Sequence, residues 1–363
     1  MSPEAGIEVS APSKIILHGE HGVVYGKMAV AGSLDLRTRM RILKITDKLI
    51  VHFPDIGVHH QTWSMKDLKP LFTQDHKLED IILQLLPDPK NPIQVASLTC
   101  FFYLYKRILN EFKGLKISVK SDIPMGAGLG SSAALSVCLA AGLLSINEHK
   151  NATDPDVISK YALLSEKILH GSPSGIDSSV SSYGGLISFK NGVIQRLNSP
   201  FDIKVLLVES GIQRNTKKIV GNVRERLLSY PKVIEPLLDG INDVSEEFLK
   251  VIQNMDEDTE PLSSDFEALE ELIAKNHSLL RTLGVSHPRL EDIVRIANSM
   301  KFRGVKLTGA GGGGFAYIFI PPTTSSYMVD KLISLIEKRG FERPRLTSIG
   351  VSGVQIKVLE DNN

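Results

Sequence analysis

Alternating hydrophobic and polar residues predict strands at both ends of the chain. In GIEVSAPSKIIL, LRTRMRILKI and KLIVHFP, apolar residues recur at about every second position, which is the period of a half-buried strand. Further strands are predicted at GLKISVKSDI, IKVLLVES, VKLTGA, FAYIFI, RLTSIG and VQIKVLE. Because helical patterns separate these strands, the fold class expected is α+β.

Apolar residues at spacings of three and four predict the helices. One such set is Leu98, Phe102, Tyr105, Leu109 and Phe112. The segment SSAALSVCLAAGLLSINEH is apolar on nearly every side, as a buried helix is. Asp154 and Pro155 suit the start of a helix that runs to about His170. Amphipathic helices are predicted at TKKIVGNVRERLL, DFEALEELIAKNHSLLRTLG and PRLEDIVRIANSM, and Gly284 and Gly340 stand where C-terminal caps belong.

A shift in composition near NSPFD (198–202) marks the expected domain boundary. Strands and helices are predicted on both sides of it, so we expect two α+β domains in tandem. The first comprises residues 1–200 and the second residues 201–363, with the last strand free to return to the first domain.

Composition and charge narrow the classes of function. The 363 residues are 42% hydrophobic and 23% charged, with a formal net charge of +1. This near-neutral balance argues against nucleic acid or an anionic membrane as a partner. Two cysteines, Cys100 and Cys138, are too few and too far apart to form a disulfide framework. The apolar stretch at residues 133–146 is too short to span a bilayer, and the N-terminus lacks the pattern of a signal peptide. We therefore expect a soluble, cytoplasmic protein.

A glycine-rich loop, PMGAGLGSSAA (124–134), joins a predicted strand to the buried helix. Glycines allow backbone N–H groups to approach an anion closely, and a helix N-terminus favours negative charge. The loop is neither a Walker A motif nor G-x-G-x-x-G. The hydroxyls of Ser131 and Ser132 suit helix capping, phosphate binding or Mg²⁺ ligation. From this loop alone, a packed turn and a phosphate site are equally supported.

A second glycine cluster, LTGAGGGGF (307–315), lies between two predicted strands. Four consecutive glycines cost much backbone entropy. This cost indicates that the backbone passes close to another loop or to a bound ligand.

Two further stretches carry groups suited to chemistry. APSKIILHGEHGVVYG (11–26) contains Lys14, which by itself is most simply a solvated lysine. It also contains the turn HGEH (18–21), which is not an HExxH motif and whose side chains are too close together in the chain to bind one zinc ion easily. LSEKILHGSPSGIDSSVSSYGG (164–185) contains Glu166, His170 and Asp177. Asp177 is either a catalytic carboxylate or a helix N-cap, and His170 is expected to be structural.

Taken together in their order along the chain, the four stretches resemble those of the GHMP kinase superfamily, and the mevalonate kinases are its most similar branch. SKIILHGEHGVVYGKMAVAGSLDLRTR, IPMGAGLGSSAALSVCLAAGLL, HGSPSGIDSSVSSYGG, RNTKKIVGNVRERLL and KLTGAGGGG carry the resemblance. It implies a ribosomal-protein-S5-like N-terminal domain, a ferredoxin-like C-terminal domain, and a cleft between them. It also implies transfer of the γ-phosphoryl group of ATP to the 5-hydroxyl of mevalonate, an early step of isoprenoid synthesis.

The resemblance also assigns roles to single residues. The nucleotide phosphates would be bound by Gly126, Ala127, Gly128, Leu129, Gly130, Ser131 and Ser132, with Ser121 near the nucleotide. Ser132 and Glu166 would hold Mg²⁺, an ion that prefers oxygen ligands. Asp177 would accept or orient the substrate hydroxyl proton, and Lys14 would stabilise the transferring phosphoryl group.

Further expectations rest on the same resemblance. Glu20, His21 and Thr216 are candidates for the mevalonate pocket, and the glycines at 309–314 would brace the phosphate loop. A homodimer is expected by analogy. Two positions depart from the family pattern: Ser13 replaces glycine and so needs a negative φ, and Asp55 replaces asparagine and so can only accept hydrogen bonds.

Two other hypotheses compete with this interpretation. One is a sister enzyme such as phosphomevalonate or homoserine kinase, although residues 11–26 offer no lysine or arginine beyond Lys14 for a phosphorylated substrate. The other is a ligand sensor without activity, which should have lost the lysine, the metal ligand or the base. All of these are present in the sequence.

Overall fold

The computed structural model describes residues 6–73, 78–124, 126, 128–170, 173–197, 202–255 and 262–359. The helices are α1 Met65–Phe72, α2 Leu78–Leu85, α3 Pro92–Leu109, α4 Ser131–Ile146, α5 Pro155–His170, α6 Ile176–Tyr183, α7 Thr216–Ser229, α8 Pro231–Asn254, α9 Ser263–Thr282, α10 Pro288–Ser299 and α11 Ser326–Lys338. Short 3₁₀ helices span Gly22–Tyr25 (η1) and Pro54–Ile56 (η2). Of these described helices, none has the length and apolar character needed to cross a bilayer.

The described strands form one sheet. They are β1 Gly6–His18, β2 Ala29–Lys44, β3 Lys48–Phe53, β4 Val58–Ser64, β5 Leu115–Ser121, β6 Leu186–Lys190, β7 Val193–Leu197, β8 Ile203–Glu209, β9 Val305–Leu307, β10 Phe315–Ile320, β11 Arg345–Ile349 and β12 Gln355–Leu359. The main path through the sheet runs β4-β3-β5-β2-β11-β8-β10-β9, and β1 and β6 pair with β2 beside it.

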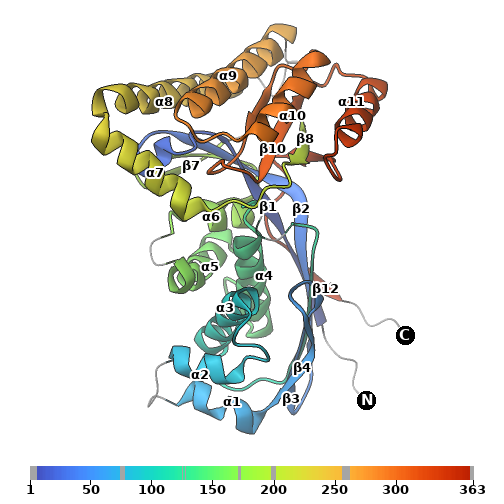
Figure 1. The fold of residues 1–363 in the computed structure, drawn as a ribbon. Helices are drawn as coiled ribbons and strands as arrows, with labels where there is room; N and C mark the ends of the chain where they lie inside the picture. Colours follow the sequence, from blue (N-terminus) through green and yellow to red (C-terminus); the bar gives the residue numbers. More distant parts are fainter. Residues whose placement is uncertain are drawn as a thin grey trace.

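Strands β1 and β2 are long enough to belong to both halves of the molecule (Figure 1). The lower part of β2 pairs with β5, β5 pairs with β3, and β3 pairs with β4. The upper parts of β1 and β2 lie beneath the C-terminal helices. The last strand, β12, pairs antiparallel with β1 from Gly6↔Leu359 to Ser10↔Gln355. The end of the described chain therefore lies beside its beginning. The division into residues 1–200 and 201–363 stays a prediction, since the sheet continues across that position.

Helix α4 is the centre of the N-terminal half. Its residues are buried on nearly every side, as the apolar pattern predicts, and it packs against β1, β2 and the helices α3, α5 and α6. Gly142 allows this packing, because a Cβ there would lie 2.6 Å from the Cε atom of Met40 and 2.7 Å from the Cδ1 atom of Ile42. The same rigid helix presents its N-terminus at the glycine loop.

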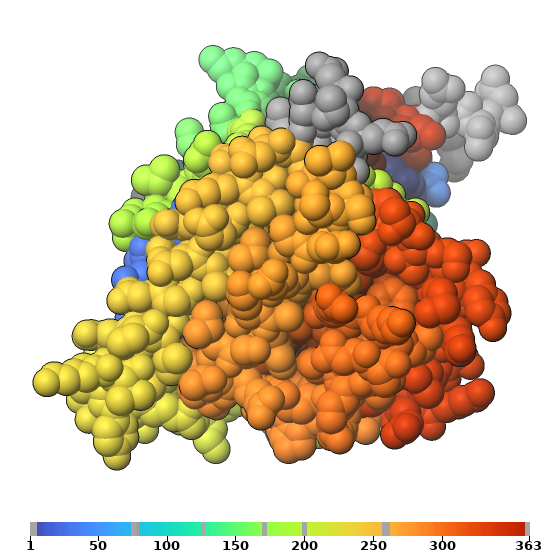
Figure 2. All heavy atoms as spheres, turned by 90° about the horizontal axis from the view of Figure 1, so that it is seen from above, coloured from blue at the N-terminus to red at the C-terminus, as the bar shows by residue number. Residues whose placement is uncertain are grey.

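In the C-terminal half, buried residues of helices α7 to α11 share one apolar cluster with residues of β8, β9 and β10. Seen from above, these helices form the face of the molecule (Figure 2). Helix α8 is not among the segments predicted from the sequence, where Pro236 obscures its pattern. The helices and strands that were predicted are otherwise present, within a few residues at their ends. Gly284 and Gly340 adopt φ values of 79° and 78°, which confirms the predicted caps.

Candidate active site

The glycine loop lies between β5 and the N-terminus of α4. Gly126, Gly128 and Gly130 have φ values of 69°, 67° and 76°, a region that residues with a Cβ rarely adopt. Gly130 is the N-cap of α4, and no side chain caps this helix. The capping role considered for Ser131 and Ser132 is therefore not realised, so the first N–H groups of the helix are open to an anion.

Lys14 lies in β1 directly against the loop. Its backbone N–H donates to the carbonyl oxygen of Leu129 at 2.8 Å. A Cβ at Gly130 would come within 3.3 Å of the Cβ atom of Lys14. Strand and loop approach this closely only because the loop residue has no side chain. A lysine more than a hundred positions away in sequence therefore reaches the loop.

Asp177 forms an ion pair with Lys14. The Nζ atom of Lys14 lies 2.9 Å from the Oδ1 atom of Asp177, and their side chains are 10% and 38% exposed. Asp177 belongs to the first turn of α6, whose N-cap is Gly175. It is therefore not the helix cap, and its carboxylate faces a lysine at the edge of an open cavity.

Glu166, on α5, is a buried carboxyl group behind this pair. It is 4% exposed, and its Oε1 atom has no hydrogen-bond partner among the described residues. Burial, followed by the charge of Asp177, raises the pKa of Glu166 to about 8, against the opposing effect of Lys14. A buried carboxylate oxygen without a partner is well suited to a cation.

The glycine loop, Glu166 and Asp177 share one cavity of about 460 Å³. Its walls are Gly126, Gly128, Gly130, Ser131, Ser132, Ala133, Glu166, Pro173, Ser174, Gly175, Asp177, Arg214 and Thr216. Among the described residues, no cluster of three or more His, Cys, Asp or Glu side chains is arranged to hold a metal ion. The orphaned oxygen of Glu166 and the hydroxyl of Ser132 still fit Mg²⁺, because this ion takes few protein ligands and completes its shell with water and phosphate oxygens.

A second cavity of about 390 Å³ adjoins the first at Gly126, Ser131 and Ser132. It is largely apolar, with Phe53, Ile56, Ile93, Val119 and Leu135 in its walls, and it also contains Ser121 and Asp55. The Oδ2 atom of Asp55 accepts a hydrogen bond from the backbone N–H of Ser121 at 2.9 Å. The carboxylate of Asp55 thus acts as a hydrogen-bond acceptor, as expected, and it holds the end of β5 beside the cavity.

Arg214 is a site residue that sequence reasoning missed. A Cβ at Gly128 would fall 0.9 Å from the Nη2 atom of Arg214, so the guanidinium lies directly over the loop. Burial lowers the pKa of Arg214, whereas the charge of Asp177 raises it. The available signal was its position at the start of RNTKKIVGNVRERLL, a stretch that carries the resemblance, immediately before Asn215, the N-cap of α7.

The second glycine cluster surrounds Arg214. A Cβ at Gly309 would lie 2.5 Å from its Nη1 atom, and a Cβ at Gly314 would lie 3.1 Å from its Cδ atom. The absence of a Cβ at Gly309 and Gly314 therefore leaves room for the side chain of Arg214. The contacts of Gly309 and Gly314 indicate that this cluster acts on the phosphate loop through Arg214.

Glu20 and His21 lie outside the lining of the described cavities. Glu20 is 2% exposed, and its carboxylate accepts hydrogen bonds from Lys306 and Asn276. His21 has a φ of 62°, and its Nε2 atom lies 2.9 Å from the carbonyl oxygen of Ala310. These hydrogen bonds connect the turn at Glu20 and His21 to the C-terminal half. The sequence did not predict the ion pair between Glu20 and Lys306.

The remaining predicted residues divide as follows. Thr216 begins α7 and lies in the wall of the 460 Å³ cavity. Ser13 is not among the residues with positive φ, so its replacement of glycine causes no backbone strain at this point of β1. Ala127 lies outside the described residues.

Comparison with known proteins places this site in a family. Residues 97–185 match the model for the GHMP kinases N terminal domain, and residues 252–335 match that for the GHMP kinases C terminal. The chain belongs to the GHMP kinases. The mevalonate kinase of Homo sapiens is 36% identical over 96% of this chain and 94% of its own length. Within the GHMP kinases, this chain belongs to the mevalonate kinase family.

Solved structures share this fold. The mevalonate kinase of Methanococcus jannaschii superposes with a TM-score of 0.76 at 25% identity and covers 94% of this chain and 98% of its own. The L. major mevalonate kinase, crystallised in complex with R-mevalonate, has a TM-score of 0.72 at 22% identity and covers 95% and 96%. The two-domain GHMP kinase fold predicted from the sequence is confirmed.

Proposed function

We propose that this protein transfers the γ-phosphoryl group of ATP to the 5-hydroxyl of mevalonate. Its membership of the mevalonate kinase family supports this activity. The observation that carries the proposal is the 2.9 Å pair of Lys14 and Asp177, because Asp177 lines a cavity that also contains the glycine loop. A cation, a carboxylate and a phosphate cradle are the groups that phosphoryl transfer to an alcohol requires.

Asp177 accepts or orients the proton of the attacking hydroxyl. The hydroxyl oxygen forms a bond to the γ-phosphorus, while the bond from that phosphorus to the bridging oxygen of ADP breaks. The proton leaves the alcohol toward the carboxylate of Asp177, and the products are 5-phosphomevalonate and ADP. Lys14, held 2.9 Å from Asp177, stabilises the negative charge on the transferring group and favours the ionised alcohol.

The nucleotide is held by backbone and by side chains from both halves. The loop from Gly126 to Ser132 and the open N-terminus of α4 bind its phosphates, and Arg214 adds a guanidinium above Gly128. The apolar 390 Å³ cavity near Ser121 receives the nucleoside. The oxygens of Ser132 and Glu166 would hold Mg²⁺, which when bound neutralises charge on the β- and γ-phosphates.

Mevalonate occupies the part of the cavity near Thr216 and Asp177. The R-mevalonate complex of the L. major enzyme, a protein of the same fold, supports a mevalonate site in this architecture. Glu20 and His21 remain candidates for this pocket, although the structure pairs them with the C-terminal half. A homodimer is a prediction that follows by analogy, and a cytoplasmic location is a prediction from the sequence.

A coupled assay of ADP release tests the proposal. Mevalonate, phosphomevalonate and homoserine are offered in parallel with ATP and Mg²⁺. We expect turnover with mevalonate and little with the other two acceptors. Turnover with only phosphomevalonate or homoserine would refute the substrate, and no turnover with any acceptor would favour the ligand sensor.

A further inference from the structure

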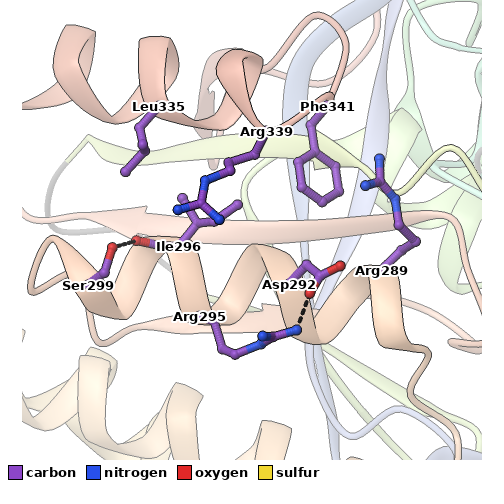
Figure 3. Close-up of a pocket in the computed structure, with 8 residues that line it drawn as sticks. All are labelled: Arg289, Asp292, Arg295, Ile296, Ser299, Leu335, Arg339 and Phe341. Atoms are coloured by element: carbon purple, nitrogen blue, oxygen red, sulfur yellow. Dashed lines mark hydrogen bonds and ion pairs between the residues drawn. The ribbon is translucent and has the colours of Figure 1, made fainter.

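A separate cavity of about 250 Å³ lies between α10 and α11, outside the catalytic cleft (Figure 3). It is lined by Arg289, Asp292, Arg295, Ile296, Ser299, Leu335, Arg339 and Phe341. The α10 residues fall on one face of that helix, and the others come from the end of α11 and the residues after it. None of these residues belongs to the catalytic machinery described above.

The charges around this cavity are unbalanced. Three arginines and one aspartate line it, which leaves an excess of two positive charges. Asp292 pairs with Arg295 on its own helix. The side chain of Arg339 reaches from the end of α11 toward α10 (Figure 3), and within the described ranges it has no hydrogen bond or ion pair. A guanidinium beside a cavity and without an acceptor is a ready donor for an anion.

Arg289 is already fixed in place. Its Nε atom donates to the carbonyl oxygen of Ser210 at 3.3 Å, and its Nη2 atom donates to that of Gly340 at 2.9 Å. Its guanidinium also stacks on the ring of Phe341, 3.9 Å from the centroid. Both acceptors are neutral, so the positive charge stays uncompensated, and three of the five N–H donors remain. An arginine held in this way loses little entropy on binding.

We propose that this cavity binds a small phosphate-bearing anion, either inorganic phosphate or a diphosphate group. The planar forks of arginine match phosphate oxygens. Ile296, Leu335 and Phe341 form the apolar part of the wall, and the arginines stand at its open side. The cavity is smaller than the ~300–1,000 Å³ typical of sites for drug-sized ligands, which suits a compact anion.

Isothermal titration of phosphate and of pyrophosphate into the full-length protein, in EDTA and at fixed ionic strength, tests this proposal. Binding to the catalytic cleft is common to all variants, so the prediction concerns the difference between them. We expect one site per chain to weaken at least ~10-fold in Arg339→Gln, as loss of a charge-assisted hydrogen bond implies. That site should vanish in the double variant Arg295→Gln/Arg339→Gln.

Lys338→Gln is the matched control, because it removes the same charge from the neighbouring position of α11 and does not line the cavity. It should bind as the wild type does. Thermal melting and kinase activity of all variants should stay near wild-type values, which shows that they fold. Equal binding stoichiometry in the wild type and the double variant would overturn the proposal, and so would an equal loss of affinity in Lys338→Gln.

Discussion

Replacing Glu166 with glutamine removes a buried negative charge and keeps the shape of the side chain. In the folded protein without metal, burial raises the pKa of Glu166 from its ordinary value of 4.5 to about 8. The folded state therefore binds a proton more tightly than the unfolded state does. The associated stability is fully present below pH ~4.5 and is lost as the pH rises through about 8.

The size of this effect follows from the pKa difference. At about 1.4 kcal/mol for each unit, the wild type loses about 5 kcal/mol between pH ~4.5 and pH ~8 relative to a residue that cannot ionise. An unfolding entropy of roughly 2.1 cal/mol/K per residue, applied to 363 residues, converts this loss into about 6 °C of melting temperature. Glu166→Gln should therefore melt about 6 °C above the wild type at pH 9 and near it at pH 4.5.

Calorimetry of both proteins in EDTA at pH 4.5 and pH 9 measures this difference. Glu267→Gln, at an exposed position on α9, is the control and should follow the wild type at both pH values. The stabilised Glu166 variant should also lose most of its Mg²⁺-dependent activity, since it lacks the proposed ligand. The same melting difference at both pH values would refute the assignment of a buried, ionisable Glu166.

Other substitutions test separate parts of the account. Lys14→Met should lower kcat by ~100-fold or more while ATP binding changes little; if only binding suffers, the lysine is a phosphate anchor. Gly128→Ala should raise the KM for ATP at least ~10-fold because its Cβ meets a guanidinium, whereas Gly192→Ala, equally strained but in open space, should leave that KM unchanged. Lys306→Met should cost ~3–5 kcal/mol of unfolding free energy in denaturant titrations, and Glu20→Leu added to it should restore much of this loss; no restoration would show that the pair is uncoupled.

The elements around the cleft were predictable because each has a local signal. Glycines mark the loop at 124–134, and an apolar run marks α4. Asp154 and Pro155 mark the start of α5, where the Oδ1 atom of Asp154 accepts a hydrogen bond from the N–H of Asp156 at 2.9 Å. The prediction that Lys14 and Asp177 act together came from resemblance. Periodicity alone does not bring two residues so far apart in the sequence to 2.9 Å.

What was missed depends on contacts between the two halves. Arg214 begins RNTKKIVGNVRERLL, one of the stretches that carry the resemblance, but its position over Gly128 arises only when the halves pack. Lys306 lies in a short strand whose alternation of apolar and polar residues predicts an exposed lysine. In the structure it is fully buried and pairs with Glu20. Buried ion pairs depend on tertiary geometry, which a single sequence does not encode in any local pattern.

The turnover of Asp177→Asn with saturating mevalonate, ATP and Mg²⁺ tests the central claim most directly. The asparagine keeps the size of the side chain and removes the carboxylate that meets Lys14 at 2.9 Å. We predict that kcat falls ~100- to 10,000-fold, with the dissociation constant for ATP within about threefold of the wild type, a change below ~0.7 kcal/mol. A kcat near the wild-type value would contradict the account, because the hydroxyl would then be activated without Asp177.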